Sequence, residues 1–83
     1  MTSDEFQEKF WHVFRETLDL GQADLPPNLK MGEIEPWDSF AHINLVLALE
    51  NSFGIEFSSD EIGELTSVPK LQAGIEARIR SAS

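Results

Sequence analysis

The residues best suited to chemistry in this chain are Ser39 and His42, which follow Asp38 closely. On a helix, Ser39 and His42 would share one face at an i, i+3 spacing, and a serine beside a histidine suggests a small serine hydrolase. However, no glycines flank Ser39 as they do in a nucleophile elbow. A chain of 83 residues also has little room for a substrate pocket and an oxyanion hole. We therefore expect no catalysis by this pair.

Ser39 taken alone suggests a site of covalent modification. Asp38 is a good helix N-cap, so Ser39 is predicted in the first turn of a helix, where its hydroxyl is exposed. A phosphodiester on that hydroxyl would lie at the positive end of the helix, among unpaired backbone N–H groups. On position alone, the Asp-Ser pair is explained more simply as a capping dipeptide.

The other candidate ligands give no metal site. His12 and His42 are the only histidines, they fall on different predicted helices, and neither belongs to an HExxH motif. The chain has no cysteine, and its acidic segment lacks the alternating Asp/Asn and Gly of a calcium loop. We expect two surface histidines and no metal.

The chain is strongly acidic, and the charge is concentrated in its middle. It carries 15 Asp and Glu against 6 Lys and Arg, for a formal net charge of -9. Phosphate repulsion argues against nucleic acid and anionic membranes as partners, and favours a basic protein. Residues 31–69 contain no Lys or Arg, but they hold the acids Glu33, Glu35, Asp38, Glu50, Glu56, Asp60, Glu61 and Glu64.

The composition predicts one small folded domain covering residues 1–83. Leu, Ile, Val and Phe account for 24 of the 83 residues. In acidic disordered segments these four residue types make up less than about 20% of the sequence, so this chain has enough apolar residues for a core. The longest apolar run, Leu45 to Leu49, is far shorter than a membrane span of about 20 residues. Met1 to Glu5 is acidic, unlike a signal sequence. We expect a soluble, cytoplasmic monomer.

Two of the predicted helices flank an irregular stretch. Thr2 and Glu5 have the spacing of a capping box, and a helix is expected from there to about Leu20-Gly21, with the glycine as C-cap. Its apolar face is formed by Phe6, Phe10, Val13, Phe14 and Leu18, with Trp11 at the edge. Residues 21–38 contain prolines and glycines that forbid a long helix. Apolar side chains in this loop are expected to pin it onto the helices: Leu25, Leu29, Met31, Ile34 and Trp37.

The helix that follows is predicted from Ser39 to Phe53, with Asp38 as N-cap and Gly54 at its end. Ser58 and Glu61 form a second capping box, and Phe57 with Ile62 has the spacing of a hydrophobic staple, so a short helix is expected from about Ser59 to Leu65. Thr66 or Ser67 then caps a last helix, which has Pro69 in its first turn. Its apolar residues Leu71, Ile75 and Ile79 follow at four-residue steps, and Arg78 and Arg80 lie in its last turn.

These elements predict an all-α fold, a small antiparallel four-helix bundle of three main helices and one short one, with a long loop between the first two. The predicted core consists of Phe6, Phe10, Phe14, Ile43, Val46, Leu49, Phe53, Ile62, Leu65, Val68, Leu71, Ile75 and Ile79.

The stretch from Trp37 to Val68 resembles the acyl carrier protein family. That family has Asp-Ser-Leu, a helix of the type Leu-Val-x-Ala-Leu-Glu, then Phe-Gly and a short acidic helix with a Thr-x-x-Val-like exit. Here the corresponding residues are Asp38-Ser39-Phe40, Leu45 to Glu50, Phe53-Gly54 and Leu65 to Val68, without a gap. The first and last predicted helices agree in length and place, so the resemblance covers nearly the whole chain.

The resemblance implies that Ser39 is the attachment site of 4′-phosphopantetheine, which a phosphopantetheinyl transferase would install from coenzyme A with Mg²⁺. The terminal thiol of this arm would carry acyl or aminoacyl groups as thioesters, and the protein would be a carrier without catalytic activity. Asp38 would position Ser39 and cap the helix. Enzymes with basic patches, such as an acyl or aminoacyl ligase and downstream transferases or synthases, would dock on Phe40, Ile43, Leu47, Glu50, Asp60, Glu61 and Glu64.

Departures from the family pattern suggest a specialised pathway. Phe40 replaces the usual leucine, Ala41 and Asn44 stand where fatty-acid carriers have acids, and Pro36 replaces a glycine. Trp37-Asp38-Ser39 followed by His42 is more similar to stand-alone carriers that serve dedicated ligases. Core packing is the alternative role for Ile43 and Leu47, and we expect it to apply to one of them. An alternative for the whole chain is an acidic helical adaptor that binds a basic partner without a prosthetic group.

Overall fold

A computed structural model of the chain describes the backbone of residues 3–22 and 24–82, and the expected capping box at Thr2 lies outside them. This part of the chain forms four helices and no strand: α1 (Ser3–Leu18), α2 (Ser39–Phe53), α3 (Ser59–Glu64) and α4 (Val68–Ala82). The all-helical prediction is confirmed. None of these helices is long and apolar enough to cross a bilayer.

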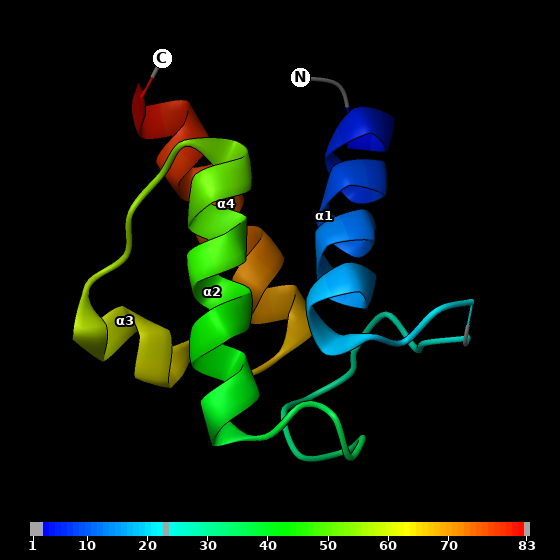
Figure 1. The fold of residues 1–83 in the computed structure, drawn as a ribbon. Coiled ribbons are helices and arrows are strands. Elements are labelled where there is room, and N and C mark those ends of the chain that lie inside the picture. The colour runs from blue at the N-terminus through cyan, green and yellow to red at the C-terminus, as the bar shows by residue number, and fades with distance from the viewer. Residues whose placement is uncertain (1–2, 23, 83) are drawn as a thin grey trace.

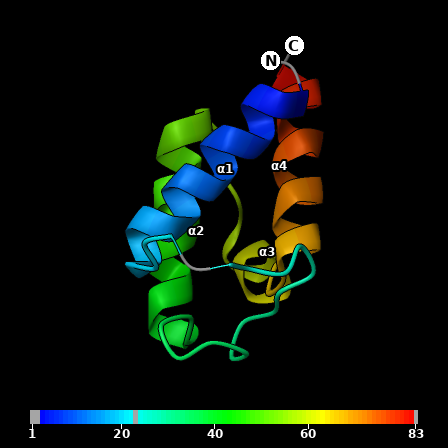
Figure 2. The ribbon, with the colours of Figure 1, turned by 90° about the vertical axis from the view of Figure 1, so that its right-hand side faces the viewer.

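The first two helices lie side by side and run in opposite directions, with α4 behind them and α3 beside the lower half of α2 (Figure 1). α1 begins and α4 ends at the same end of the molecule, and α2 begins at the opposite end (Figure 2). A reciprocal pair of amide bonds joins α1 to α4, because each of Gln7 and Gln72 donates from its Nε2 to the Oε1 of the other, at 3.2 and 3.1 Å.

The end of α1 differs from its prediction. α1 ends at Leu18, two residues before the predicted Leu20-Gly21, because Asp19 takes the left-handed conformation with φ 55°. The Leu20 N–H donates to the Arg15 carbonyl at 2.9 Å, which closes the helix in the manner of a Schellman motif. A short polar side chain such as Asp tolerates this backbone conformation.

The remaining helix ends follow the local signals in the sequence. Gly54 ends α2 with φ 67°, and its N–H donates to the Glu50 carbonyl. Ser58 and Glu61 form both bonds of the predicted capping box on α3, which ends one residue earlier than expected. At the start of α4, Ser67 Oγ accepts the Lys70 N–H at 3.3 Å.

The segment that leads from α1 to α2 is held by two hydrogen bonds to the junction of α3 and α4 and by buried side chains. The Met31 N–H donates to the Thr66 carbonyl and the Val68 N–H donates to the Leu29 carbonyl, both at 2.8 Å, so the segment pairs with the junction of α3 and α4. Leu29 and Trp37 are buried, while Leu25, Met31 and Ile34 pack partly against the core, as predicted.

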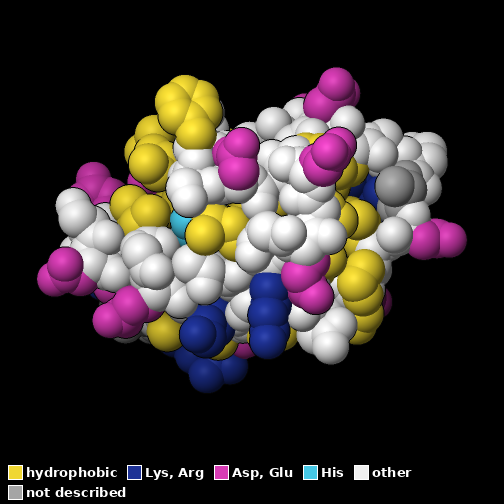
Figure 3. All heavy atoms as spheres, turned by 90° about the horizontal axis from the view of Figure 1, so that it is seen from below, with side chains coloured by type: hydrophobic (Ala, Val, Ile, Leu, Met, Phe, Trp, Pro, Cys, Tyr) yellow, Lys and Arg dark blue, Asp and Glu magenta, His cyan; other side chains and the backbone are white. Residues whose placement is uncertain are grey.

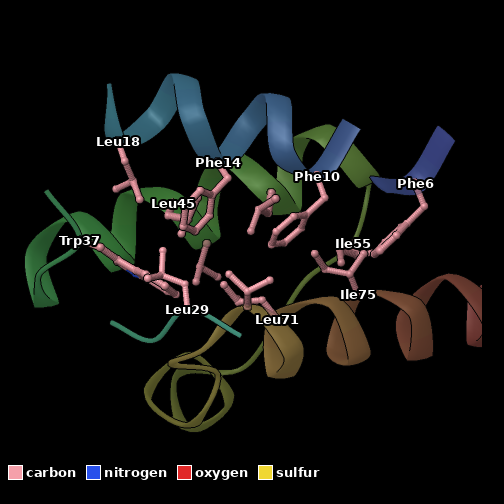
Figure 4. Packing of buried hydrophobic residues seen from close by; sticks show 13 residues of the cluster. Phe6, Phe10, Phe14, Leu18, Leu29, Trp37, Leu45, Ile55, Leu71 and Ile75 are labelled. Carbon is pink, nitrogen blue, oxygen red and sulfur yellow. The ribbon is translucent and has the colours of Figure 1, made fainter. Parts of the chain in front are cut away.

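The core fills the space between α1, α2 and α4, where side chains from all three point towards one another (Figure 4). Ile43 is a wrong core prediction, because its side chain is 51% exposed. Four other predicted members, Phe53, Ile62, Leu65 and Ile79, pack only partly at the rim, as does Trp11. The core instead also includes Leu18, Leu29, Trp37, Leu45 and Ile55.

Candidate functional site

The candidate site is built around the first turn of α2. Ser39 is the first residue of this helix and is exposed. Asp38 precedes it in an extended conformation, and its Oδ1 accepts the Ala41 N–H at 2.8 Å. The Asp38 carbonyl accepts the His42 N–H at 2.9 Å, which begins the helical ladder. The predicted N-cap role of Asp38 is thereby confirmed, and the Ser39 hydroxyl is open to an approaching molecule.

His42 lies in the same turn but is buried, and the expectation that it is a surface residue is wrong. Its side chain is only 3% exposed. Trp37, which is fully buried, donates its Nε1–H to His42 Nδ1 at 3.0 Å, and His42 Nε2 lies 3.0 Å from the Ile62 carbonyl of α3. An indole nitrogen only donates, so Nδ1 is the acceptor and Nε2 carries the proton given to Ile62.

Burial controls the protonation of this ring. Desolvation lowers the pKa of His42 below its usual value, and the bond to the Ile62 carbonyl opposes this lowering only in part. His42 is therefore neutral near pH 7. Both ring nitrogens are engaged by Trp37 and Ile62, so neither is free to accept the Ser39 proton, which argues directly against a serine–histidine hydrolase.

His12 is the exposed histidine of the chain. It lies on α1, and its Nε2 is 3.5 Å from a carboxylate oxygen of Glu16, one turn further on. Over the residues that the structure describes, no three His, Asp or Glu side chains converge to hold a metal ion.

Three large apolar side chains project from α2 into solvent, and we call them the apolar stripe. Phe40, Ile43 and Leu47 are 77%, 51% and 49% exposed and follow one another at three- and four-residue steps. The opposite side of α2 buries His42, Leu45, Val46 and Leu49, so the expectation that Ile43 or Leu47 belongs to the core fails for both. Ser39 lies four residues before Ile43, beside the stripe.

Charge is distributed unevenly around the end of the molecule where α2 begins. In Figure 3, hydrophobic side chains gather at the upper left, Asp and Glu stand along the left and upper rim, and Lys and Arg gather along the lower edge. Asp60 and Glu64 are exposed on α3, which packs beside α2 through the contact of His42 with Ile62. Figure 3 also shows acidic side chains on both sides of the hydrophobic group at the upper left.

Two of the predicted docking acids have structural partners. Glu50 is half-buried, and its Oε2 accepts the Phe57 N–H at 2.6 Å, which fixes the chain after α2. Glu61 pairs with Arg78 of α4 and accepts the Ser58 N–H. The Ser58 N–H, and then the Arg78 guanidinium, hold the pKa of Glu61 below its usual value.

The sequence reasoning missed the link from Trp37 through His42 to Ile62. Trp37 directly before the N-cap and His42 in the first turn after it could have indicated a bond between the two rings. The third member is a backbone carbonyl twenty residues away, which no local pattern could supply. Searched against models of known protein families, the chain matches none of them.

Proposed function

We propose that this chain is an acyl carrier protein, and that Ser39 bears 4′-phosphopantetheine. The observation that carries the proposal is the placement of an exposed serine hydroxyl at the first position of a capped helix, directly beside the exposed apolar stripe. A phosphate on that hydroxyl would be stabilised by the positive end of α2. In this proposal the four helices form the antiparallel bundle of a carrier domain, with the segment before Asp38 as its long loop.

The protein itself would have no catalytic activity. The chain contains no cysteine, so in the proposed carrier the only thiol is the one on the arm, and no protein thiol competes for the acyl group. Acyl and aminoacyl thioesters both fit this chemistry. The departures from fatty-acid carriers at Phe40, Ala41 and Asn44 favour a specialised cytoplasmic pathway with a dedicated ligase.

The apolar stripe and the α3 acids suit the proposed enzyme partners. A partner surface with an apolar patch flanked by Lys or Arg would cover Phe40, Ile43 and Leu47 and would pair with Asp60 and Glu64. Such contacts favour fast, salt-sensitive and weak encounters, which suits a carrier that must leave each enzyme. Glu50 and Glu61 would contribute less, because each already accepts a bond within the protein.

The test is incubation with coenzyme A, Mg²⁺ and a broad-specificity phosphopantetheinyl transferase. The intact mass should rise by one phosphopantetheinyl group, and Ser39→Ala should abolish the gain. Ser59→Ala is a matched control, because Ser59 is also an exposed first residue of a capped helix; it should be modified like the wild type. No mass gain under conditions that modify a control carrier would overturn the proposal.

The apolar stripe also favours a second candidate, an acidic adaptor that binds a basic partner without a prosthetic group. Three exposed large side chains on one helix face suit protein binding whether or not Ser39 is modified. Partner capture that is equal for the unmodified protein, the modified protein and Ser39→Ala would support the adaptor over the carrier.

A further inference from the structure

The environment of His42 joins three parts of the fold that meet near Ser39. Its own backbone lies in the first turn of α2, its Nδ1 bonds Trp37 of the preceding segment, and its Nε2 bonds Ile62 of α3, each at 3.0 Å. Trp37 in turn packs edge-on against Phe14 of α1, with ring centroids 5.1 Å apart. The imidazole therefore connects α3 to the residues immediately before Ser39.

This connection exists in only one protonation state. The neutral Nε2–H form accepts from Trp37 with one nitrogen and donates to Ile62 with the other. A proton added to Nδ1 turns that acceptor into a donor facing the indole N–H. Two donors cannot bond one another, so the Trp37 bond must break. The fully buried indole would then have no acceptor, and the new imidazolium would be cut off from water.

The charged groups near His42 do not offset this cost. Asp38 is one turn before it, but its carboxylate is exposed and bonds the Ala41 N–H. On α3, Glu61 is committed to Ser58 and to Arg78 of α4. α1 presents the uncharged ring of Phe14, through Trp37.

We infer that neutral His42 is a proton-sensitive tie that holds the segment before Ser39, through Trp37, against α2 and α3, and that protonation of its ring releases Trp37 from this tie. The depressed pKa of His42 is consistent with the arrangement. The tie does not depend on whether Ser39 is modified. When it opens, the Trp37 indole loses its acceptor while the His42 Nε2–H still donates to Ile62, so the segment that precedes Ser39 becomes free to move relative to α2 and α3.

The first test is nuclear magnetic resonance of protein labelled with ¹⁵N. Near neutral pH, the ring nitrogens of His42 should show the Nε2–H form. On acidification, the indole N–H of Trp37 and the amides of Ser39 and Gly63 should shift together with His42. The His12→Gln variant removes the exposed histidine and should leave this transition unchanged. An Nδ1–H form of His42, or Ser39 and Gly63 amides that do not follow it, would overturn the inference.

The second test uses solvent exchange of the two indole N–H groups. Trp11 is an internal control, since its Nε1–H bonds Gln7 Oε1 at 3.1 Å, with no histidine involved. Below the pKa of His42, exchange of Trp37 relative to Trp11 should speed up by about fivefold, the effect of one lost hydrogen bond of typical strength. An unchanged ratio would contradict the release of the indole.

A substitution then separates the tie from general acid effects. Gln at position 42 offers an oxygen to Trp37 and an amide N–H to Ile62, but it cannot take up a proton. His42→Gln should therefore fold and lose the shared transition of Trp37, Ser39 and Gly63. Persistence of that transition in His42→Gln would assign it to another group and refute the inference. If this variant does not fold, the titration of His12→Gln alone still decides the question.

Discussion

The N-cap of α2 gives the sharpest test of how the site is held. Asp38→Ala removes the acceptor of the Ala41 N–H, which is bonded at 2.8 Å. Loss of an N-cap side chain costs typically about 1 kcal/mol of unfolding free energy, and loss of a negative charge at a helix N-terminus adds about 0.3–1 kcal/mol. Asp38 is exposed, so solvent keeps the charge contribution small. We expect a total loss of about 1–1.5 kcal/mol, equivalent to a fall in Tm of about 5–10 °C for a domain of this size.

The assay is thermal and urea unfolding followed by far-ultraviolet circular dichroism. Asp38→Asn keeps a side-chain oxygen for the Ala41 N–H and should lose only a few tenths of a kcal/mol. Asp24→Ala is the matched charge control, since Asp24 is exposed and lies outside the four helices; it should stay within about 0.5 kcal/mol of the wild type. If Asp38→Ala were no less stable than Asp24→Ala, the cap would not contribute to stability. If Asp38→Asn fell as far as Asp38→Ala, charge rather than the hydrogen bond would be responsible.

Three further predictions concern the rest of the fold. Gly54→Ala should destabilise the protein by about 1 kcal/mol in urea unfolding purely through its left-handed backbone, because nothing lies within 4 Å of the added Cβ; a neutral effect would exclude backbone strain there. Phe10→Ala, at a fully buried ring, should cost about 3–5 kcal/mol, and an unchanged urea midpoint would contradict the core assignment. Since burial lowers the pKa of His42, the unfolded chain binds the extra proton first, so the contribution of this residue is complete above about pH 6.5 and is lost as the pH falls below it. The urea midpoint of the wild type should therefore drop more than that of His42→Gln between pH 7 and pH 5.5, and parallel curves would contradict this.

The helix caps were predictable because each depends on residues three or four apart. Asp38, Gly54 and the pair Ser58–Glu61 each act where the sequence placed them. The end of α1 failed for a related reason. Gly21 is the more obvious terminator, but Asp19 was already able to take the left-handed conformation and end the helix two residues earlier.

The exposed and buried sides of α2 were not predictable in the same way. Its apolar residues surround most of the helix, so periodicity alone does not say which side faces α1 and which faces solvent. Ile43 was therefore misplaced in the core, and His42 was taken for a surface residue although Trp37 and Ile62 supply partners that make its burial possible. The exposure of Ser39 and the cap at Asp38 followed from local rules, whereas the link through His42 depends on contacts between distant segments.

The shared end of α1 and α4 has a practical consequence for handling the protein. The first turn of α1 and the last turn of α4 lie at the same end of the molecule, and α2, which Ser39 begins, starts at the opposite end (Figures 1 and 2). A bead, a fluorescent protein or a neighbouring domain attached at either terminus would leave the serine pointing away from the attachment. Two copies joined in tandem would each keep Ser39 accessible. The length of the linker would set the effective concentration of one copy relative to the other.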